Sequence, residues 1–409
     1  MSATLPLTST LFESADHTVV VIDIPKSIEE AQEPQAAEST QEKILEDGLR
    51  KSRPRRRLVS TPAPTEPFAT PPGRLDTSHD AFQSLASQLS ELTTMAAVER
   101  ALSQLKCANF VGPWCLPRCA LQVPPTRVEH LERESGGALV PPGARYLNGS
   151  IADLRDEFIA KAPQFDLIVL DPPWPNRSAR RRQQGQRSKT GASNEVNGAD
   201  HGYNTVRNMG ALSDLLKQIP AGSKLTETGF IAVWVTNKPS CEALLTDSKH
   251  GVFRAWGVEL VATWTWLKVT TRGEPIVSVD SHWRRPWERL LLARRLGSEA
   301  AVRGAGKAKA LPLNRVIVGV PDVHSRKPHL RRLMSPFLAP TSPGDHIKDV
   351  HCGLEIFARN LTAGWWSWGD EVLLFQHPRW WSEDTDEKQI DMESTERQLS
   401  PINKQPLLS

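Results

Sequence analysis

No apolar run in this 409-residue sequence approaches the ~20 residues that a membrane-spanning helix needs. The N-terminus lacks a basic region followed by an apolar core, which is the pattern of a secretory signal. Cysteine is scarce: the five residues are an odd number, and they lack the paired C-x-x-C spacing of a structural zinc site. We therefore expect no membrane partner, no disulfide framework and no bound metal, and reduced thiols in the nucleus or the cytosol.

Charge of one sign is not in large excess, because the formal net charge is only +3. Two basic runs are present locally: RKSRPRRR, from Arg50 to Arg57, and NRSARRRQQGQRSK, from Asn176 to Lys189. The first is typical of a nuclear localisation signal or a nucleic-acid contact, and equally of a solvated stretch in a disordered tail. On this basis we expect a nuclear protein, with the cytoplasm as a second location.

The two ends of the chain are polar. Residues 1–75 are rich in Pro, Ser, Thr, Glu and Gln, which predicts a disordered tail interrupted by a short strand at HTVVVIDI. Residues 382–409 predict a second disordered tail. In residues 76–145, apolar side chains recur every three or four positions from Phe82 to Leu105, which predicts an amphipathic helix packed on its own domain. A Pro-rich, irregular stretch follows this helix.

Residues 146–381 show short apolar runs that alternate with helical patterns, which predicts an α/β fold with a largely parallel sheet. The expected strands are DLIVL, GFIAVWVT, VELVATWTWLK, ERLLLARR, RVIVGV, GLEIFA and EVLLFQ. The expected helices are MGALSDLLKQI, PSCEALLTDS and HLRRLMSPFL. The stretch RRLGSEAAVRGAGKAKALPL predicts an inserted loop.

The stretch FDLIVLDPPW places Asp171 at the end of an expected buried strand, the edge at which open α/β sheets bind ligands. Pro172 and Pro173 predict a stiff turn without N–H groups, Asp171 is an acceptor-only carboxylate, and Trp174 offers an aromatic face. These groups suit a flat molecule with an NH₂ group, such as a purine, whose amine attacks the methyl group of a sulfonium. The same letters are also typical of an ordinary turn, so the surrounding residues must decide.

Further motifs follow in a consistent order: WVTN (Trp234 to Asn237), WTWLKVTTRGE, RPWERLLLAR, VHSRKPHL and LEIFARNLTAGWWSWGDEVLLFQ. Together with DPPW, this set resembles the adenine-N6 methyltransferase family named for the seventy-kilodalton subunit of the mRNA adenosine methyltransferase. Within that family the chain is most similar to the methyltransferase-like 4 branch. The resemblance covers residues from about Tyr146 to His377.

The resemblance implies a Rossmann-like class I methyltransferase with permuted motif order, dependent on S-adenosylmethionine. Residues 146–381 would form the methyltransferase domain, with an Arg-rich insertion at 176–200, preceded by the helical and irregular N-terminal region. The strand GLEIFA would bind the cofactor without the usual G-x-G-x-x-G. The implied reaction is N6-methylation of adenine in nucleic acid by a monomer, specifically of 2′-O-methyladenosine in U2 small nuclear RNA.

Three other functions stay open at this point: methylation of adenine in DNA, a non-catalytic RNA-binding subunit of a methyltransferase complex, and methylation of a protein amide. Related Asn/Asp-Pro-Pro-Tyr tetrads act on glutamine, and Trp174 in place of that tyrosine argues against the protein amide. The intact DPPW tetrad favours an active enzyme over a non-catalytic subunit.

The family's functional residues are carried over one position at a time. The resemblance implies a catalytic tetrad of Asp171, Pro172, Pro173 and Trp174. It implies that the cofactor contacts Asp171, Lys327, Arg359, Asn360, Asp370 and Glu371. On the substrate side it implies Tyr203, Asn237, Lys268, Trp287 and Glu288. The insertion adds basic residues that are suited to phosphates, Arg180 and Arg181 with Arg177, Arg182, Arg187 and Lys189.

Thirteen tryptophans against two tyrosines is an unusual ratio, and Trp283 and Trp287 beside Arg284 and Arg285 are candidates to stack on bases. Three departures from the family pattern concern the cofactor and substrate sides. Asp370 stands where the branch has Asn, TAGWW replaces Gln-Pro-Gly-Trp, and the segment between Trp174 and Tyr203 is longer than in relatives.

Overall fold

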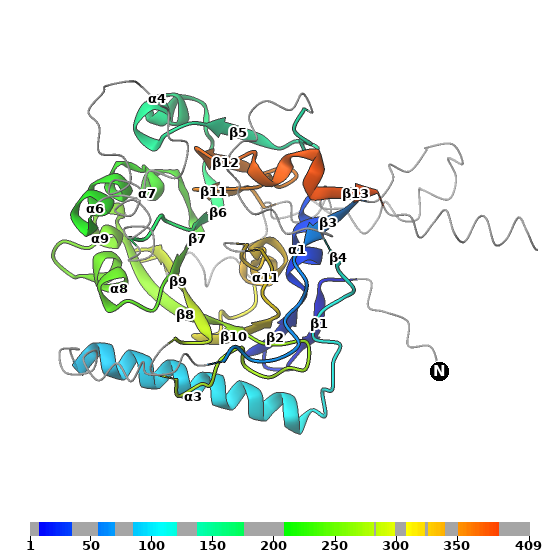
Figure 1. The fold of residues 1–409 in the computed structure, drawn as a ribbon. Helices are drawn as coiled ribbons and strands as arrows, with labels where there is room; N and C mark the ends of the chain where they lie inside the picture. Colours follow the sequence, from blue (N-terminus) through cyan, green and yellow to red (C-terminus); the bar gives the residue numbers. More distant parts are fainter. Residues whose placement is uncertain are drawn as a thin grey trace, which may run out of the picture.

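Ten strands form one mixed sheet in this computed structural model, in the order β1-β2-β10-β8-β9-β7-β6-β11-β12-β5 (Figure 1). The structure describes residues 8–34, 56–69, 85–120, 137–175, 208–281, 284–298, 308–323, 326–339 and 351–383. All strands of this sheet run in one direction except β1 and β9, which are antiparallel to their neighbours. The predicted α/β class with a largely parallel sheet is therefore confirmed.

The strands of the large sheet are β1 (Thr10–Glu13), β2 (Val19–Ile22), β5 (Arg145–Asn148), β6 (Phe165–Leu170), β7 (Leu225–Val235), β8 (Val258–Lys268), β9 (Trp287–Arg295), β10 (Asn314–Gly319), β11 (Gly353–Ile356) and β12 (Trp366–Gly369). A second, three-stranded sheet contains β13 (Trp381–Glu383), β3 (Arg56–Ser60) and β4 (Cys119–Ala120). Six of the seven predicted strands correspond to β6 through β11.

The helices are α1 (Ile24–Ala31), α3 (Leu85–Cys107), α4 (Ile151–Lys161), α6 (Met209–Gln218), α7 (Ala221–Lys224), α8 (Pro239–Thr246), α9 (Val252–Trp256) and α11 (Leu330–Met334). Alternate residues of each central strand pack on opposite faces, because the side-chain period of a strand is two. In β6, Ile168 and Leu170 join the apolar cluster under α6, α8 and α9, and Leu167 and Val169 join the cluster under α1 and α11. The sheet is thus covered by helices on both faces.

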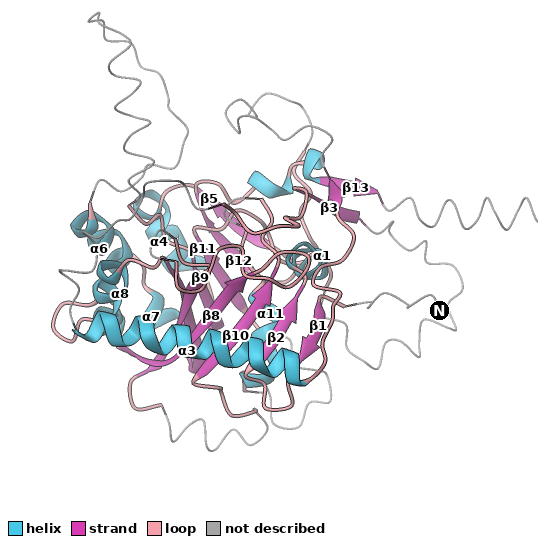
Figure 2. Cartoon of the chain, turned by 60° about the horizontal axis from the view of Figure 1, so that its bottom comes forward, coloured by secondary structure: helices cyan, strands magenta, loops and turns pink. Residues whose placement is uncertain are grey.

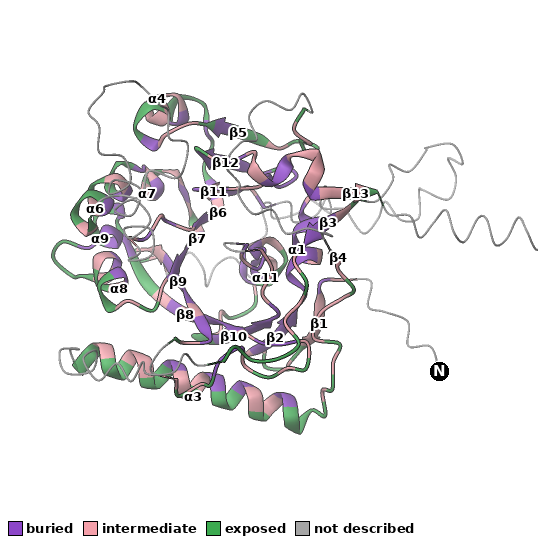
Figure 3. Cartoon of the chain, in the orientation of Figure 1, coloured by how far each residue is buried: buried purple, intermediate pink, exposed green. Residues whose placement is uncertain are grey.

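The prediction of a disordered tail over residues 1–75 is wrong for residues 8–34 and 56–69. All four residues of β2 are buried, and β2 pairs in parallel with β10 inside the large sheet (Figure 3). The predicted strand within HTVVVIDI is confirmed. The composition of the whole tail masked this segment, because a VVVI run is apolar enough to add a strand to the sheet even when its flanks are polar.

The basic run from Arg50 to Arg57 also extends into this ordered part. Arg56 and Arg57 belong to β3, and the guanidinium of Arg57 forms an ion pair with Glu29 at 3.3 Å. The earlier residues of the run lie outside the described residues. Arg57 is therefore part of the fold and is not in a freely solvated stretch.

Helix α3 confirms the predicted helix and lies across the sheet (Figure 2), but its buried residues all come from Thr94 onward. Its buried residues include Val98, Ala101 and Leu105, which contact the cluster formed with β2 and β10. Near the N-terminus of the helix, Leu85 and Leu89 are 84% and 66% exposed. The apolar pattern therefore continues beyond the part of α3 that covers the sheet.

The expected strand EVLLFQ is not formed. The strand in this region is β12, and the chain then turns into a 3₁₀ helix at Leu374–Gln376. Val372 is buried against Ala358 and Leu361, in a small cluster separate from the sheet. A short apolar run indicates burial, but it does not distinguish a strand from a buried turn.

Candidate active site

The predicted site residues gather at one edge of the sheet. Strands β6, β7, β8 and β12 end there and the antiparallel strand β9 begins there, so their flanking residues are neighbours in space. This register explains how residues far apart in the sequence meet at the position where α/β sheets bind ligands. The predicted residues at this edge are Asp171, Asn237, Lys268, Glu288 and Asp370.

The DPPW turn is held rigidly by its own atoms and by its neighbours. The backbone N–H of Trp174 donates to the carbonyl of Pro172 at 2.7 Å, which closes a tight turn around Pro173. The indole N–H of Trp174 donates to the carbonyl of Trp234 at 2.9 Å. The ammonium of Lys238 donates to the carbonyl of Pro175. The turn that follows Asp171 is therefore fixed to the end of β7.

Two features limit what this turn offers to a ligand, and the second corrects the expected aromatic face of Trp174. The carbonyl of Pro172 already accepts one hydrogen bond, so only its second lone pair is available to a ligand. Trp174 does not present an open aromatic face, because it is 8% exposed and belongs to the core under α6 and α8. Its buried ring anchors the turn to the apolar core.

A chain of alternating charges connects the sheet edge to the loop after β10. Lys327 lies 3.3 Å from the carboxylate of Asp171 and 2.8 Å from that of Glu288. The other carboxylate oxygen of Glu288 accepts from Lys268, whose ammonium lies 4.5 Å from the ring centre of Trp266. Lys327 thus bridges two acids that the resemblance assigns to the catalytic and the substrate sides.

Burial and pairing shift these groups in opposite directions. Burial raises the pKa of Asp171 above its ordinary value, although the charge of Lys327 opposes this effect. Burial would also raise the pKa of Glu288, but Lys327 and Lys268 outweigh it and lower that pKa to about 2. Burial lowers the pKa of Lys268, whereas Asp171 and Glu288 overcome the burial of Lys327 and raise its pKa. Lys327 is therefore a firmly held cation.

A cavity opens beside Asp171, with about 550 Å³ of empty space that includes its opening to solvent. Four of the predicted cofactor residues line it: Asp171, Lys327, Arg359 and Asn360. The amide nitrogen of Asn360 is buried and has no hydrogen-bond partner among the described residues. A buried amide without a partner costs free energy, which a bound polar ligand would recover.

Asp370 and Glu371 are not part of the cavity lining. Glu371 instead accepts from the guanidinium of Arg359 at 3.0 Å, and Asp370 is exposed at the end of β12. Partial burial and the nearby charge of Asp153 raise the pKa of Asp370. Of these two acids, Glu371 is therefore connected to the cavity through its ion pair with Arg359.

On the substrate side, Asn237 and Trp287 hold the sheet edge together. The side-chain amide of Asn237 donates to the carbonyl of Trp287 at 2.5 Å, which ties the end of β7 to the start of β9. Trp287 is 2% exposed, with the guanidinium carbon of Arg285 5.7 Å from its ring centre. The expectation that Trp287 stacks on a base is wrong for this structure, because its ring is buried.

Several predicted substrate residues lie outside the described residues: Tyr203, Trp283, Arg177, Arg180, Arg181, Arg182, Arg187 and Lys189. Among the described residues, no helix is both long and apolar enough to cross a membrane, and no group of three or more His, Cys, Asp or Glu side chains is arranged to hold a metal ion.

Glu355 and Ile28 are among the cavity-lining residues that the sequence interpretation missed. Glu355 is an acid within the apolar strand β11, and burial together with the charge of Asp171 raises its pKa to about 8. An acid inside an otherwise apolar run was the available signal. Ile28 reaches the cavity from α1, in the segment predicted to be disordered, so no local pattern pointed to it.

Several known proteins are similar to this chain. The MT-A70 family profile matches residues 165–371. The N6-methyladenosine RNA methyltransferase MTA1 of Cryphonectria parasitica is 45% identical over 92% of this chain and 94% of its own length. The human N(6)-adenine-specific methyltransferase METTL4 is 32% identical over 58% of this chain and 44% of its own length. A DNA N6-methyl methyltransferase of Caenorhabditis elegans is 29% identical over 71% of this chain and 67% of its own length.

The fold and the sheet-edge site define a class I methyltransferase that depends on S-adenosylmethionine. The chain belongs to the MT-A70 family, as its motifs predicted. The residues present fit that cofactor. The cavity places the cation Lys327 and the free amide of Asn360 together, which suits a ligand with a carboxylate and hydroxyl groups.

Proposed function

We propose that this protein methylates the exocyclic N6 amine of adenine in RNA. The observation that carries the proposal is the position of Asp171, which ends β6 on the wall of the cavity and lies 3.3 Å from Lys327. A carboxylate held there can accept both hydrogens of a flat aromatic amine together with the remaining lone pair of the Pro172 carbonyl. S-adenosylmethionine, when bound, supplies the methyl group on a sulfonium.

The charge of Lys327 affects the protonation state of Asp171. The amine nitrogen of adenine is a poor nucleophile because its lone pair is delocalised into the ring, and hydrogen bonds to carboxylate and carbonyl oxygens increase its electron density. The ionised carboxylate is the stronger acceptor, because protonation turns one of its oxygens into a donor. Burial favours the protonated form of Asp171, and the charge of Lys327 counteracts this. The ion pair therefore limits the rise in the pKa of Asp171 and favours the ionised carboxylate.

Two observations favour RNA over DNA. The relative with 45% identity over nearly the whole chain is named as an RNA methyltransferase, and the DNA methyltransferase relative is 29% identical. A single-stranded RNA also presents its bases without the unstacking cost of a duplex. Adenosine in U2 small nuclear RNA that already carries a 2′-O-methyl group is the specific substrate that we propose to test first.

The test is methyl transfer by the wild type and by Asp171→Ala, with labelled S-adenosylmethionine and separate RNA, DNA and protein pools, followed by mass spectrometry of the nucleosides. We expect N6-methyladenosine in the RNA pool from the wild type and at least a hundredfold less from the variant, because removal of a charge-stabilising group in a preorganised site typically costs about that factor. Label in DNA or protein alone would reject the RNA assignment. Undiminished transfer by a folded Asp171→Ala variant would reject the site.

A further inference from the structure

Helix α1 precedes the stretch that the family profile matches, yet it lies against the cofactor cavity. Ile28 lines this cavity together with Lys327 and Asn360. The helix begins firmly: the side chain of Asp23 caps its first turn by accepting from the N–H of Lys26 at 2.8 Å. A rigid, capped helix beside a ligand cavity is well placed to fix the loops around it.

The first loop that α1 holds is the one that carries Lys327. The hydroxyl of Ser27 accepts from the backbone N–H of His329 at 3.1 Å, and its own hydrogen is directed to the carbonyl of Ile24 at 2.7 Å. Ser27 is 4% exposed, so this bond is sheltered from water. The bond lies two residues from Lys327 and restricts how that ammonium is directed into the cavity.

The second loop carries Arg359 and Asn360. The side-chain amide of Gln32, the residue after α1, donates to the carbonyl of Leu361 at 2.8 Å. The N–H of Ala363 donates to the carbonyl of Ala31 at 2.8 Å. The end of α1 therefore holds the loop next to Asn360, whose buried side-chain amide has no hydrogen-bond partner among the described residues.

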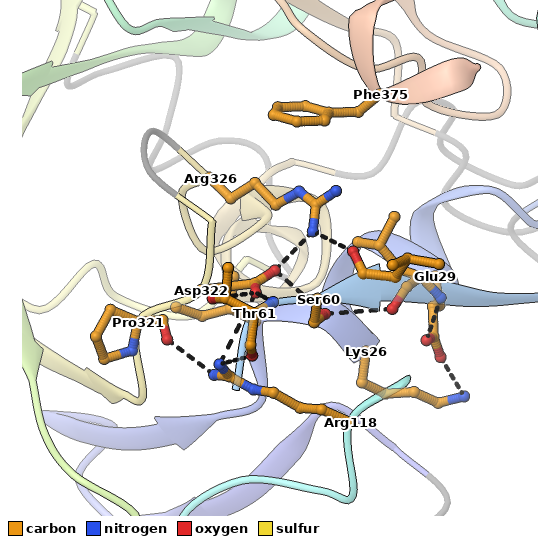
Figure 4. A network of polar contacts seen from close by, with 12 residues as sticks. Lys26, Glu29, Ser60, Thr61, Arg118, Pro321, Asp322, Arg326 and Phe375 are labelled. Carbon is orange, nitrogen blue, oxygen red and sulfur yellow. Dashed lines mark hydrogen bonds and ion pairs between the residues drawn. The ribbon is translucent and has the colours of Figure 1, made fainter. Parts of the chain in front are cut away.

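A buried polar network strengthens the connection to the first loop (Figure 4). Arg326, which precedes Lys327, forms an ion pair with Asp322 at 2.7 Å and donates to the carbonyl of Val59 in β3 at 2.8 Å. Asp322 also accepts from the N–H of Thr61 at 2.9 Å. Phe375 covers the guanidinium, with its ring centre 4.4 Å from the central carbon of Arg326. Two N-terminal elements, α1 and β3, thus contact the loop that carries Lys327.

We propose that α1, through Ser27 and Gln32, positions the Lys327 loop and the Arg359–Asn360 loop for binding of S-adenosylmethionine. This inference rests on the proposed function. It assigns to Ser27 and Gln32 the role of positioning residues, since neither takes part in the methyl transfer itself. A ligand that binds between two loops gains affinity when both are already held in the bound arrangement. Loss of these hydrogen bonds is expected to weaken the cofactor and leave the reacting groups in place.

The test compares Ser27→Ala, Gln32→Ala and their double variant in the full chain. Lys26→Ala is the matched control, because its side chain lies on the same helix but, within the part of the chain that the structure describes, pairs with Glu29 alone, at 3.2 Å. Calorimetry measures the Kd of S-adenosylmethionine and of S-adenosylhomocysteine, and kinetics separate KM for the cofactor from kcat. We expect the double variant to raise Kd and KM about tenfold, the combined effect of two lost hydrogen bonds, with kcat at saturation within about twofold of the wild type.

The outcomes separate this inference from the proposed function. No binding of either ligand by the wild type overturns both. Wild-type binding with an unchanged Kd in the double variant overturns the role of α1 alone, as does an equal weakening by Lys26→Ala. If the double variant fails to fold, Gln32→Glu decides, because it removes the donor to Leu361 at a half-buried position and should weaken binding without a loss of thermal stability.

Discussion

Replacement of Lys327 by methionine should move the acid limb of the activity profile to higher pH. Lys327 lies 3.3 Å from the carboxylate of Asp171. At an effective dielectric constant of about 20, Coulomb's law gives an attraction of about 5 kcal/mol at that separation, before the cost of desolvation is counted. Opposite charges this close typically shift a carboxyl pKa by about one to three units.

The direction follows from the role of the carboxylate. Asp171 must be ionised to accept hydrogens from the amine, so activity rises as the pH passes upward through its pKa. Without Lys327, burial and the charge of Glu288 both favour the protonated acid. We therefore expect the acid limb of log kcat to move upward by about one to three pH units in Lys327→Met, with partial recovery of activity at alkaline pH.

The assay is methyl transfer to an adenosine-containing RNA from about pH 5.5 to about pH 9.5, at saturating S-adenosylmethionine. Lys268→Met is the control. It removes the other cation that pairs with Glu288 and leaves the ion pair between Lys327 and Asp171 in place. Lys327→Arg keeps the charge and should leave the limb near its wild-type position. A uniform loss of activity in Lys327→Met with an unmoved acid limb would refute the electrostatic role.

Two further changes test the buried charges. Glu355→Gln should stabilise the protein by roughly 2 kcal/mol at pH 7, allowing for partial solvent screening. The pKa of Glu355 is raised to about 8, so its carboxyl destabilises the folded wild type when it has to ionise. This destabilisation is absent at low pH and grows as the pH rises from the ordinary pKa of 4.5. Thermal unfolding at pH 5 and pH 8 should therefore show the stability gain of Glu355→Gln only at pH 8. Asp322→Ala should cost ~3–5 kcal/mol in urea unfolding, because it leaves Arg326 buried and unpaired; a cost below about 1 kcal/mol would contradict this pairing.

Local patterns in the sequence were sufficient for much of the fold and the site. The run before Asp171 and the alternation of apolar runs with helices predicted the strands and placed Asp171 at the ligand-binding edge of the sheet, whereas Lys327 was assigned by the resemblance to the family. These features depend on residues that are close in sequence, or on the general rule that parallel strands end at one edge.

The parts that were missed depend on contacts between distant residues. Trp174 is buried because its indole reaches Trp234 in the next strand, and nothing in DPPW itself encodes that partner. Helix α1 was hidden because its flanks are polar and its binding partners, such as Leu361, come from the other end of the chain. Composition is an average over a whole segment, whereas burial depends on the distant residues against which that segment packs.

The parallel pairing of β2 with β10 has a consequence for synthesis of the chain. Val19 pairs with Val316, so the VVVI segment is synthesised long before β10, its partner on the side away from β1. During that interval an apolar strand with unsatisfied backbone groups is available to other chains, and a chaperone that shields it would raise the yield of native protein. The pairing of β2 with β10, and with it the contacts of α1 with the loops that carry Lys327 and Asn360, must wait until most of the chain has been translated.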